Sequence, residues 1–153
     1  DFQKALTKAL LAANLNLKPS TGVLLSIADQ HKAEAVSLVR NLADAGCLLY
    51  ATEGTAAMIS AMGLPVNMTT KKLSEGHPNV VDVIEDGSVS AVVNTISGSP
   101  EVMRDGFYIR RAAVEKHIPC FTSMDTARAA AESLPSEPAS YDIATIGEYL
   151  EAR

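Results

Sequence analysis

The stretch Cys47-Leu48-Leu49-Tyr50-Ala51-Thr52-Glu53-Gly54-Thr55 decides the fold that this sequence predicts. Its first five residues form an apolar run of the length of one buried strand. Its last four residues are small or polar, and residues 54–62 predict a short helix that opens there. A strand that passes directly into a helix is the repeating unit of an α/β fold.

The same alternation continues in both directions along the chain. Apolar residues at helical spacing predict helices at 2–14, 31–45, 54–62, 79–85, 107–117, 124–133 and 145–151. Short apolar runs predict strands at 23–27, 47–51, 66–68, 89–93 and 118–122, with a long polar loop at 94–106 and a linker at 135–140. Gly46 stands where a glycine ends a helix. The pattern predicts a three-layer Rossmann-like α/β domain, with a mostly parallel sheet of about five strands flanked by helices.

Length and composition fit one globular domain of 153 residues, of which 47% are apolar. The net charge of −5 argues against nucleic-acid binding, and no apolar run is long enough to span a bilayer. Cys47 and Cys120 are too few and too far apart for a disulfide framework, which favours a reducing compartment. We therefore expect a cytoplasmic protein that binds neither nucleic acid nor membrane.

Small hydroxyl and amide residues follow most of the predicted strands, where ligands bind in parallel sheets. They are Ser26, Thr52, Thr55, Asn94, Thr95, Ser97, Thr122 and Ser123. Lys32, Lys71 and Lys72 lie nearby in sequence, and Gly54 lets a ligand approach the free N–H groups of a helix N-terminus. These residues predict an anion-binding cradle. The alternative is that Thr52 and Thr55 only cap the helix, and the charge of Glu53 opposes anion binding.

Other polar residues carry weaker signals. His31, His77 and His117 lack metal-ligand spacing, so we expect no metal site. No acid/base pair or catalytic triad can be assigned, and the Walker and Gly-x-Gly-x-x-Gly motifs are absent. Arg110 and Arg111 are expected to lie on a helix surface.

Five motifs, in chain order, carry a resemblance to a known family. They are Ser26-Ile27 with Lys32; Tyr50-Ala51-Thr52-Glu53-Gly54-Thr55-Ala56; Lys72 with Glu75-Gly76-His77-Pro78; Val92-Val93-Asn94-Thr95-Ile96-Ser97-Gly98; and Tyr108-Ile109-Arg110-Arg111-Ala112-Ala113. Over nearly its whole length the chain resembles the methylglyoxal-synthase-like domains, in particular the C-terminal allosteric domain of the carbamoyl-phosphate synthase large chain. The combination of Asn-Thr-x-Ser-Gly with Ile-Arg-Arg-x-Ala is specific to it, whereas Thr-x-Gly-Thr is shared by the broader family.

The resemblance implies a site for a nucleotide monophosphate, with UMP as inhibitor or IMP as activator in bacterial members. Matched motif to motif, the residues that would hold the phosphate are Lys32, Thr52, Thr55 and Lys72, with Gly54 beside them. Asn94, Thr95 and Ser97 would line the pocket, and Asp105 would approach the ribose or base. Ile96 departs from the pattern, because many bacterial members have a second threonine there.

The resemblance also implies a larger context. The parent chain would be an ATP-dependent ligase, the glutamine-dependent carbamoyl-phosphate synthase of pyrimidine and arginine biosynthesis, which uses ATP with Mg²⁺ or Mn²⁺. The partners would be the rest of the large chain and the glutaminase small chain. Residues 1–18 would form a linking helix and residues 19–153 a non-catalytic regulatory domain without a cofactor of its own. Asp1 in place of an initiator Met fits a piece of a longer chain.

Three other hypotheses stay open at this stage. A free-standing lyase acting on a triose phosphate would need a carboxylate base beside the cradle, and its Gly-Gly-Asp and Pro-His-x-x-Asp stretches are missing here. The cyclohydrolase of purine synthesis shares the Thr-x-Gly-Thr turn, but its Lys-Thr-Leu-His-Pro-Lys stretch is absent. The last is a scaffold domain whose effector site has decayed.

Overall fold

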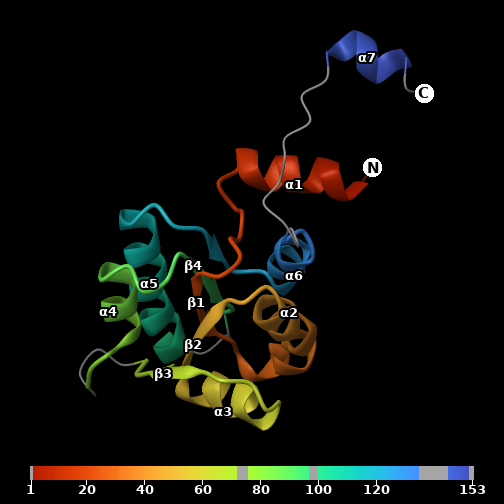
Figure 1. Ribbon diagram of the computed structural model, residues 1–153. Coiled ribbons are helices and arrows are strands. Elements are labelled where there is room, and N and C mark those ends of the chain that lie inside the picture. The colour runs from red at the N-terminus through yellow and green to blue at the C-terminus, as the bar shows by residue number, and fades with distance from the viewer. Residues whose placement is uncertain (1, 72–75, 97–99, 135–144, 152–153) are drawn as a thin grey trace.

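The computed structural model describes residues 2–71, 76–96, 100–134 and 145–151. The described residues up to 134 form an α/β domain (Figure 1). The strands are β1 (Gly22–Ser26), β2 (Leu48–Thr52), β3 (Asn67–Thr69), β4 (Ala91–Asn94) and β5 (Cys120–Phe121). The helices are α1 (Phe2–Ala12), α2 (Lys32–Asp44) after a 3₁₀ turn at Asp29–His31, α3 (Glu53–Ala61), α4 (Val80–Glu85), α5 (Pro100–Glu115), α6 (Met124–Glu132) and α7 (Ile146–Glu151). The predicted alternation of strands and helices is confirmed.

All the strand pairs are parallel, in the order β3-β2-β1-β4-β5. The chain builds outward from β1 to β3 and then crosses to β4 on the other side of β1. The order of strands therefore reverses between β1 and β4, and ligands of open parallel sheets bind outside the carboxyl ends at such a reversal. The fold thus marks the carboxyl ends of β1 and β4 as the place to look for a site.

Helices cover both faces of the sheet. One apolar cluster joins α2, α3 and α6 to one face, and a second joins α4 and α5 to the other (Figure 1). Leu24 of β1 and Ile109 of α5 are fully buried in the second cluster, and Leu25 and Leu38 in the first. A domain with its own core on both faces of its sheet is expected to fold without a partner chain.

Helix α1 lies on the amino-terminal side of the sheet. The Asn14 side chain, just after α1, donates a hydrogen bond to the backbone oxygen of His117, which precedes β5. Leu10 and Leu17 are buried in the core cluster that faces α2. The candidate site lies at the opposite, carboxyl edge of the strands. The division of the chain at residue 18 stays a prediction.

The predicted loop at 94–106 is wrong over its second half, because α5 begins at Pro100. Proline fits the first turn of a helix, where its missing N–H costs no hydrogen bond. The charged residues and the glycine at position 106 interrupt the apolar spacing that indicates a helix, so the sequence did not predict its first turns. Gly46, in contrast, ends α2 as predicted, with a φ of 73°.

Candidate functional site

Four neighbouring strands each end on a polar residue. In the parallel register Ser26 pairs with Asn94, and Thr52 pairs with Thr69. Ser26 follows Leu25, which pairs with Ala51 just before Thr52, so the four residues form one row across the sheet. All four are buried, and Thr69 Oγ1 has no hydrogen-bond partner among the described residues. The row places hydroxyl and amide groups along the carboxyl edge, as the sequence predicted for Ser26, Thr52 and Asn94.

The N-terminus of α3 opens onto this row. Thr52 is the N-cap residue, yet its side chain makes no capping hydrogen bond. The Thr52 hydroxyl therefore does not cap α3. A Cβ placed on Gly54 would lie 3.1 Å from Lys32 Nζ. The missing side chain of Gly54 thus lets an ammonium group come close to the positive end of α3, an arrangement that favours an anion.

Two lysines and one aspartate set the charge near this helix end. Lys32 Nζ lies 2.7 Å from Asp29 Oδ1, and the Asp29 side chain is 94% exposed. The hydrogen bond and charge of Lys32 hold the pKa of Asp29 below its usual value, and the charge of Lys71 acts in the same direction. Both lysines therefore act at this edge of the sheet. Asp29 is an exposed counter-ion that an anionic ligand can replace on Lys32.

The hydroxyls of Thr55 and Thr95 hold the backbone that follows β1. Thr55 Oγ1 accepts a hydrogen bond from Ile27 N at 3.0 Å, and Thr95 Oγ1 accepts one from Ala28 N at 2.8 Å. The Thr55 hydroxyl also donates to the Ile27 backbone oxygen. Both side chains are buried. Their hydroxyls therefore fix the loop that leads to Lys32.

Arg110 turns toward the sheet, which its position in the sequence did not predict. It was expected on a helix surface, but its Nη1 donates a hydrogen bond to Asn94 Oδ1 at 3.0 Å. Arg111 does lie on the surface, where its Nε is 2.8 Å from Glu115 Oε1. The signal in the sequence was Gly106, because a glycine one turn before an arginine inside a helix leaves room for the arginine to fold back.

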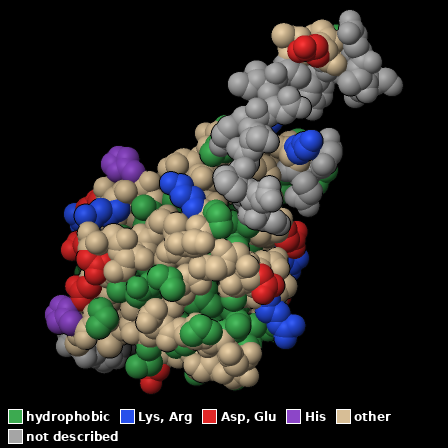
Figure 2. All heavy atoms as spheres, in the orientation of Figure 1, with side chains coloured by type: hydrophobic (Ala, Val, Ile, Leu, Met, Phe, Trp, Pro, Cys, Tyr) green, Lys and Arg blue, Asp and Glu red, His purple; other side chains and the backbone are tan. Residues whose placement is uncertain are grey.

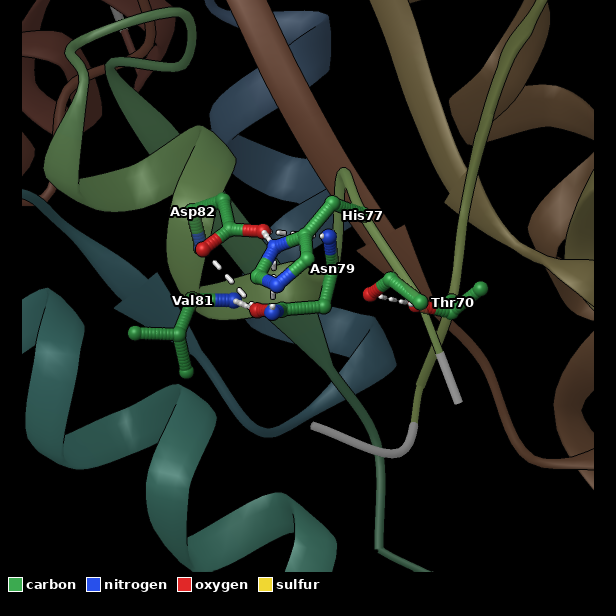
Figure 3. A network of polar contacts seen from close by, with 6 residues as sticks. Thr70, His77, Asn79, Val81 and Asp82 are labelled. Carbon is green, nitrogen blue, oxygen red and sulfur yellow. Dashed lines mark hydrogen bonds and ion pairs between the residues drawn. The ribbon is translucent and has the colours of Figure 1, made fainter. Parts of the chain in front are cut away.

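Loop residues next to Lys71 are fastened at the start of α4 (Figure 3). Asn79 and Asp82 form a capping box, and His77 Nδ1 pairs with Asp82 Oδ2. The Thr70 hydroxyl donates to the Gly76 backbone oxygen at 3.1 Å. The backbone N–H of Asn79, followed by the side-chain hydrogen bond of His77, holds the pKa of Asp82 below its usual value. The chain is thus anchored on both sides of the segment 72–75.

Other residues named in the sequence fall into three groups. Lys72, Ser97 and the side chain of Asp105 lie outside the described residues. Glu53 is exposed. Cys47 and Cys120 are free thiols whose pKa values are raised by burial, so neither favours a reactive thiolate.

The family model for MGS-like domains (MGS abbreviates methylglyoxal synthase) matches residues 34–122, more than half of the sequence. The chain belongs to the MGS-like domain family. The five-stranded parallel sheet flanked by helices agrees with this membership.

A curated relative of this MGS-like domain is the carbamoyl phosphate synthase large chain of Thermomicrobium roseum (strain ATCC 27502 / DSM 5159 / P-2). The two are 45% identical over 148 residues, which is 97% of this chain and 14% of the relative. The chain therefore spans about a seventh of the length of the curated relative that it matches. None of the helices in the described parts of the chain has the length and apolar character needed to cross a membrane.

Proposed function

We propose that this MGS-like domain is an allosteric effector-binding domain of the large chain of glutamine-dependent carbamoyl-phosphate synthase. Its ligand is a nucleotide monophosphate such as UMP or IMP, bound at the carboxyl edge of the sheet. The phosphate-binding residues are Lys32, Thr52, Gly54, Lys72 and Thr55. Thr55 contributes its backbone N–H in the first turn of α3, because its hydroxyl already bonds the Ile27 backbone. Asn94, Thr95 and Ser97 line the pocket, and Asp105 approaches the ribose or base.

One observation carries the proposal, namely the position of the Lys32 ammonium beside Gly54 at the start of α3. A phosphate placed there meets backbone N–H groups, the helix dipole and a fixed cation together. The Thr69 hydroxyl, which has no partner among the described residues, and the Thr52 hydroxyl, which does not cap α3, add polar groups in the same row. Each of these groups favours an anion with several acceptor oxygens.

The surface supports a small ligand rather than a polyanion. Acidic and basic side chains stand side by side along the margin over α4 and α5 (Figure 2). The net charge of −5 acts against long-range attraction of nucleic acid. Local positive charge at the strand ends is enough for one phosphate group, which needs only a few donors.

The proposal extends to the parent enzyme, and the similarity to a carbamoyl phosphate synthase large chain supports it. The ligase activity belongs to the parent enzyme, which serves pyrimidine and arginine biosynthesis in the cytoplasm, and this domain is non-catalytic. Its partners are the rest of the large chain and the glutaminase small chain. We assign ATP and its Mg²⁺ or Mn²⁺ to the rest of the large chain, as part of the same proposal. Effector binding here shifts the parent between two states for which the effector has different affinity.

Thermal unfolding of the 153-residue chain with and without ligand tests the proposal. UMP or IMP at about 100 times its Kd should stabilise the fold by about 2.7 kcal/mol. That gain corresponds to a rise in Tm of about 5–10 °C for a chain of this length. Lys32→Met should remove most of the rise, whereas Lys18→Met, which alters an exposed lysine before β1 on the other edge, should leave it intact.

Two outcomes would contradict the proposal. The absence of any shift with a panel of nucleotide monophosphates would favour a scaffold domain whose site has decayed. Turnover of dihydroxyacetone phosphate to methylglyoxal would favour the lyase, which uses a similar phosphate cradle.

A further inference from the structure

Arg110 reaches from α5 to the end of β4, where the order of strands reverses. Its Nη1 lies 3.0 Å from Asn94 Oδ1, and Asn94 is only 3% exposed. Gly106, one helical turn before Arg110, is what leaves room for this contact. A Cβ at Gly106 would lie 2.8 Å from Arg110 Nη1 and 3.1 Å from Asn94 Oδ1. Glycine is unfavourable inside a helix, so its presence here is explained by the close approach of the guanidinium.

The contact fixes the orientation of the Asn94 amide. A guanidinium has only donors, so Asn94 must offer its carbonyl oxygen to Arg110. The NH₂ group on the same planar amide then faces away from Arg110. No hydrogen bond from Asn94 Nδ2 joins it to another residue of the described part of the chain. Asn94 therefore has a donor available in the row that it shares with Ser26.

We propose that Arg110 is a positioning residue that locks Asn94 as a hydrogen-bond donor to an acceptor oxygen of the bound nucleotide. This inference rests on the proposed function of the site. Without Arg110 the amide can rotate by half a turn and present its oxygen, which repels the oxygens of an anionic ligand. Arg110 thus acts on ligand choice through Asn94.

Arg111 is the matched control for this role. It is the next residue on the same helix and has the same charge, but its guanidinium pairs with Glu115 on the surface. Losing Arg111 changes the net charge by the same amount as losing Arg110. A difference between the two variants therefore reports on the contact with Asn94 and not on charge alone.

Calorimetric titration of the chain with UMP and with IMP tests the proposal. Arg110→Met should weaken binding by about tenfold, the cost of one good hydrogen bond. Arg110→Lys, which keeps a donor, should recover part of the affinity, and Arg111→Met should bind like the unmodified chain. Asn94→Asp keeps an acceptor for Arg110 but lacks the NH₂ group, so it should lose at least as much affinity as Arg110→Met while remaining folded.

A double-variant comparison separates positioning from direct contact. On an Asn94→Ala background the Arg110→Met change should cost less than twofold, because the group that it positions is gone. A full tenfold loss on that background would show that Arg110 contacts the ligand itself and would overturn the proposal. Unchanged binding by Arg110→Met in the native background would overturn it as well.

A ligand-free measurement keeps this inference distinct from the proposed function. The side-chain NH₂ signals of Asn94 in a ¹⁵N-labelled sample, identified with Asn94→Ala, should move in Arg110→Met and stay in place in Arg111→Met. Unmoved signals would refute the amide lock. If the signals move but no nucleotide binds to the unmodified chain, the lock exists and the proposed function fails.

Discussion

Replacing Gly54 by alanine should raise the stability of the free domain and weaken its ligand binding at the same time. Gly54 is an exposed residue in the first turn of α3. Alanine there reduces the conformational entropy of the unfolded chain and favours the helix by about 0.5–1 kcal/mol. For a chain of this length that gain raises the Tm by about 1–4 °C.

The effect on binding has the opposite sign. The new Cβ would lie 3.1 Å from Lys32 Nζ, closer than an ordinary van der Waals contact, so the ammonium must move by a few tenths of an ångström. The methyl group also stands where a phosphate would approach the first N–H groups of α3. We expect about a tenfold loss of affinity for UMP or IMP, which lowers the ligand-induced stabilisation by about 1.4 kcal/mol.

Thermal unfolding with and without nucleotide measures both effects in one experiment. Ser60→Ala is the control, because it also places alanine on an exposed position of α3 but lies near the far end of the helix. It should raise the Tm of the free chain and leave the ligand-induced shift unchanged. The reasoning is refuted if Gly54→Ala lowers the Tm of the free chain, or if its ligand-induced shift equals that of the unmodified chain.

Two further predictions concern stability. Gly22→Ala should lower the free energy of unfolding by about 2–4 kcal/mol in urea denaturation, because its Cβ would lie 1.9 Å from the Ser88 backbone oxygen, which cannot rotate away. Gly87→Ala, at a φ of 80° with open space around it, should cost only about 1 kcal/mol, and equal losses in the two variants would disprove the clash. The depressed pKa of Asp82 contributes stability that is present above about pH 4 and is lost as the pH falls through the folded-state pKa. Asp82→Asn should therefore flatten the acid side of the Tm–pH curve, and an unchanged curve would show that the capping box and His77 do not stabilise the carboxylate.

The sequence predicted the strands and their polar ends because both signals are local. An apolar run followed by Thr52 or Asn94 indicates where a strand ends. The parallel pairing of the strands then places their carboxyl ends next to one another. The start of α5 at Pro100 was missed because a glycine and several charged residues hid its helical spacing. The resemblance to the family supplied the residue roles, which spacing alone left open.

Side-chain direction could not be predicted from the sequence. Arg110 and Arg111 are identical neighbours, and only the packing of α5 over β4 turns one inward and the other to the surface. The hydroxyls of Thr55 and Thr95 are as suited to a phosphate as to a backbone N–H, and the path of the chain after β1 decides between these partners.

The hydroxyls of Thr55 and Thr95 hold the loop after β1 whether or not a ligand is bound. Because Thr55 and Thr95 fix Ile27 and Ala28 before any ligand arrives, the loop needs no ordering on binding, which would otherwise cost about 1–2 kcal/mol per residue. Selection on folding alone would then retain both threonines in a descendant that has changed or lost its effector. Their presence in a homologous sequence would therefore indicate an intact scaffold, whereas a glycine at position 54 together with a lysine at position 32 would indicate the proposed anion site.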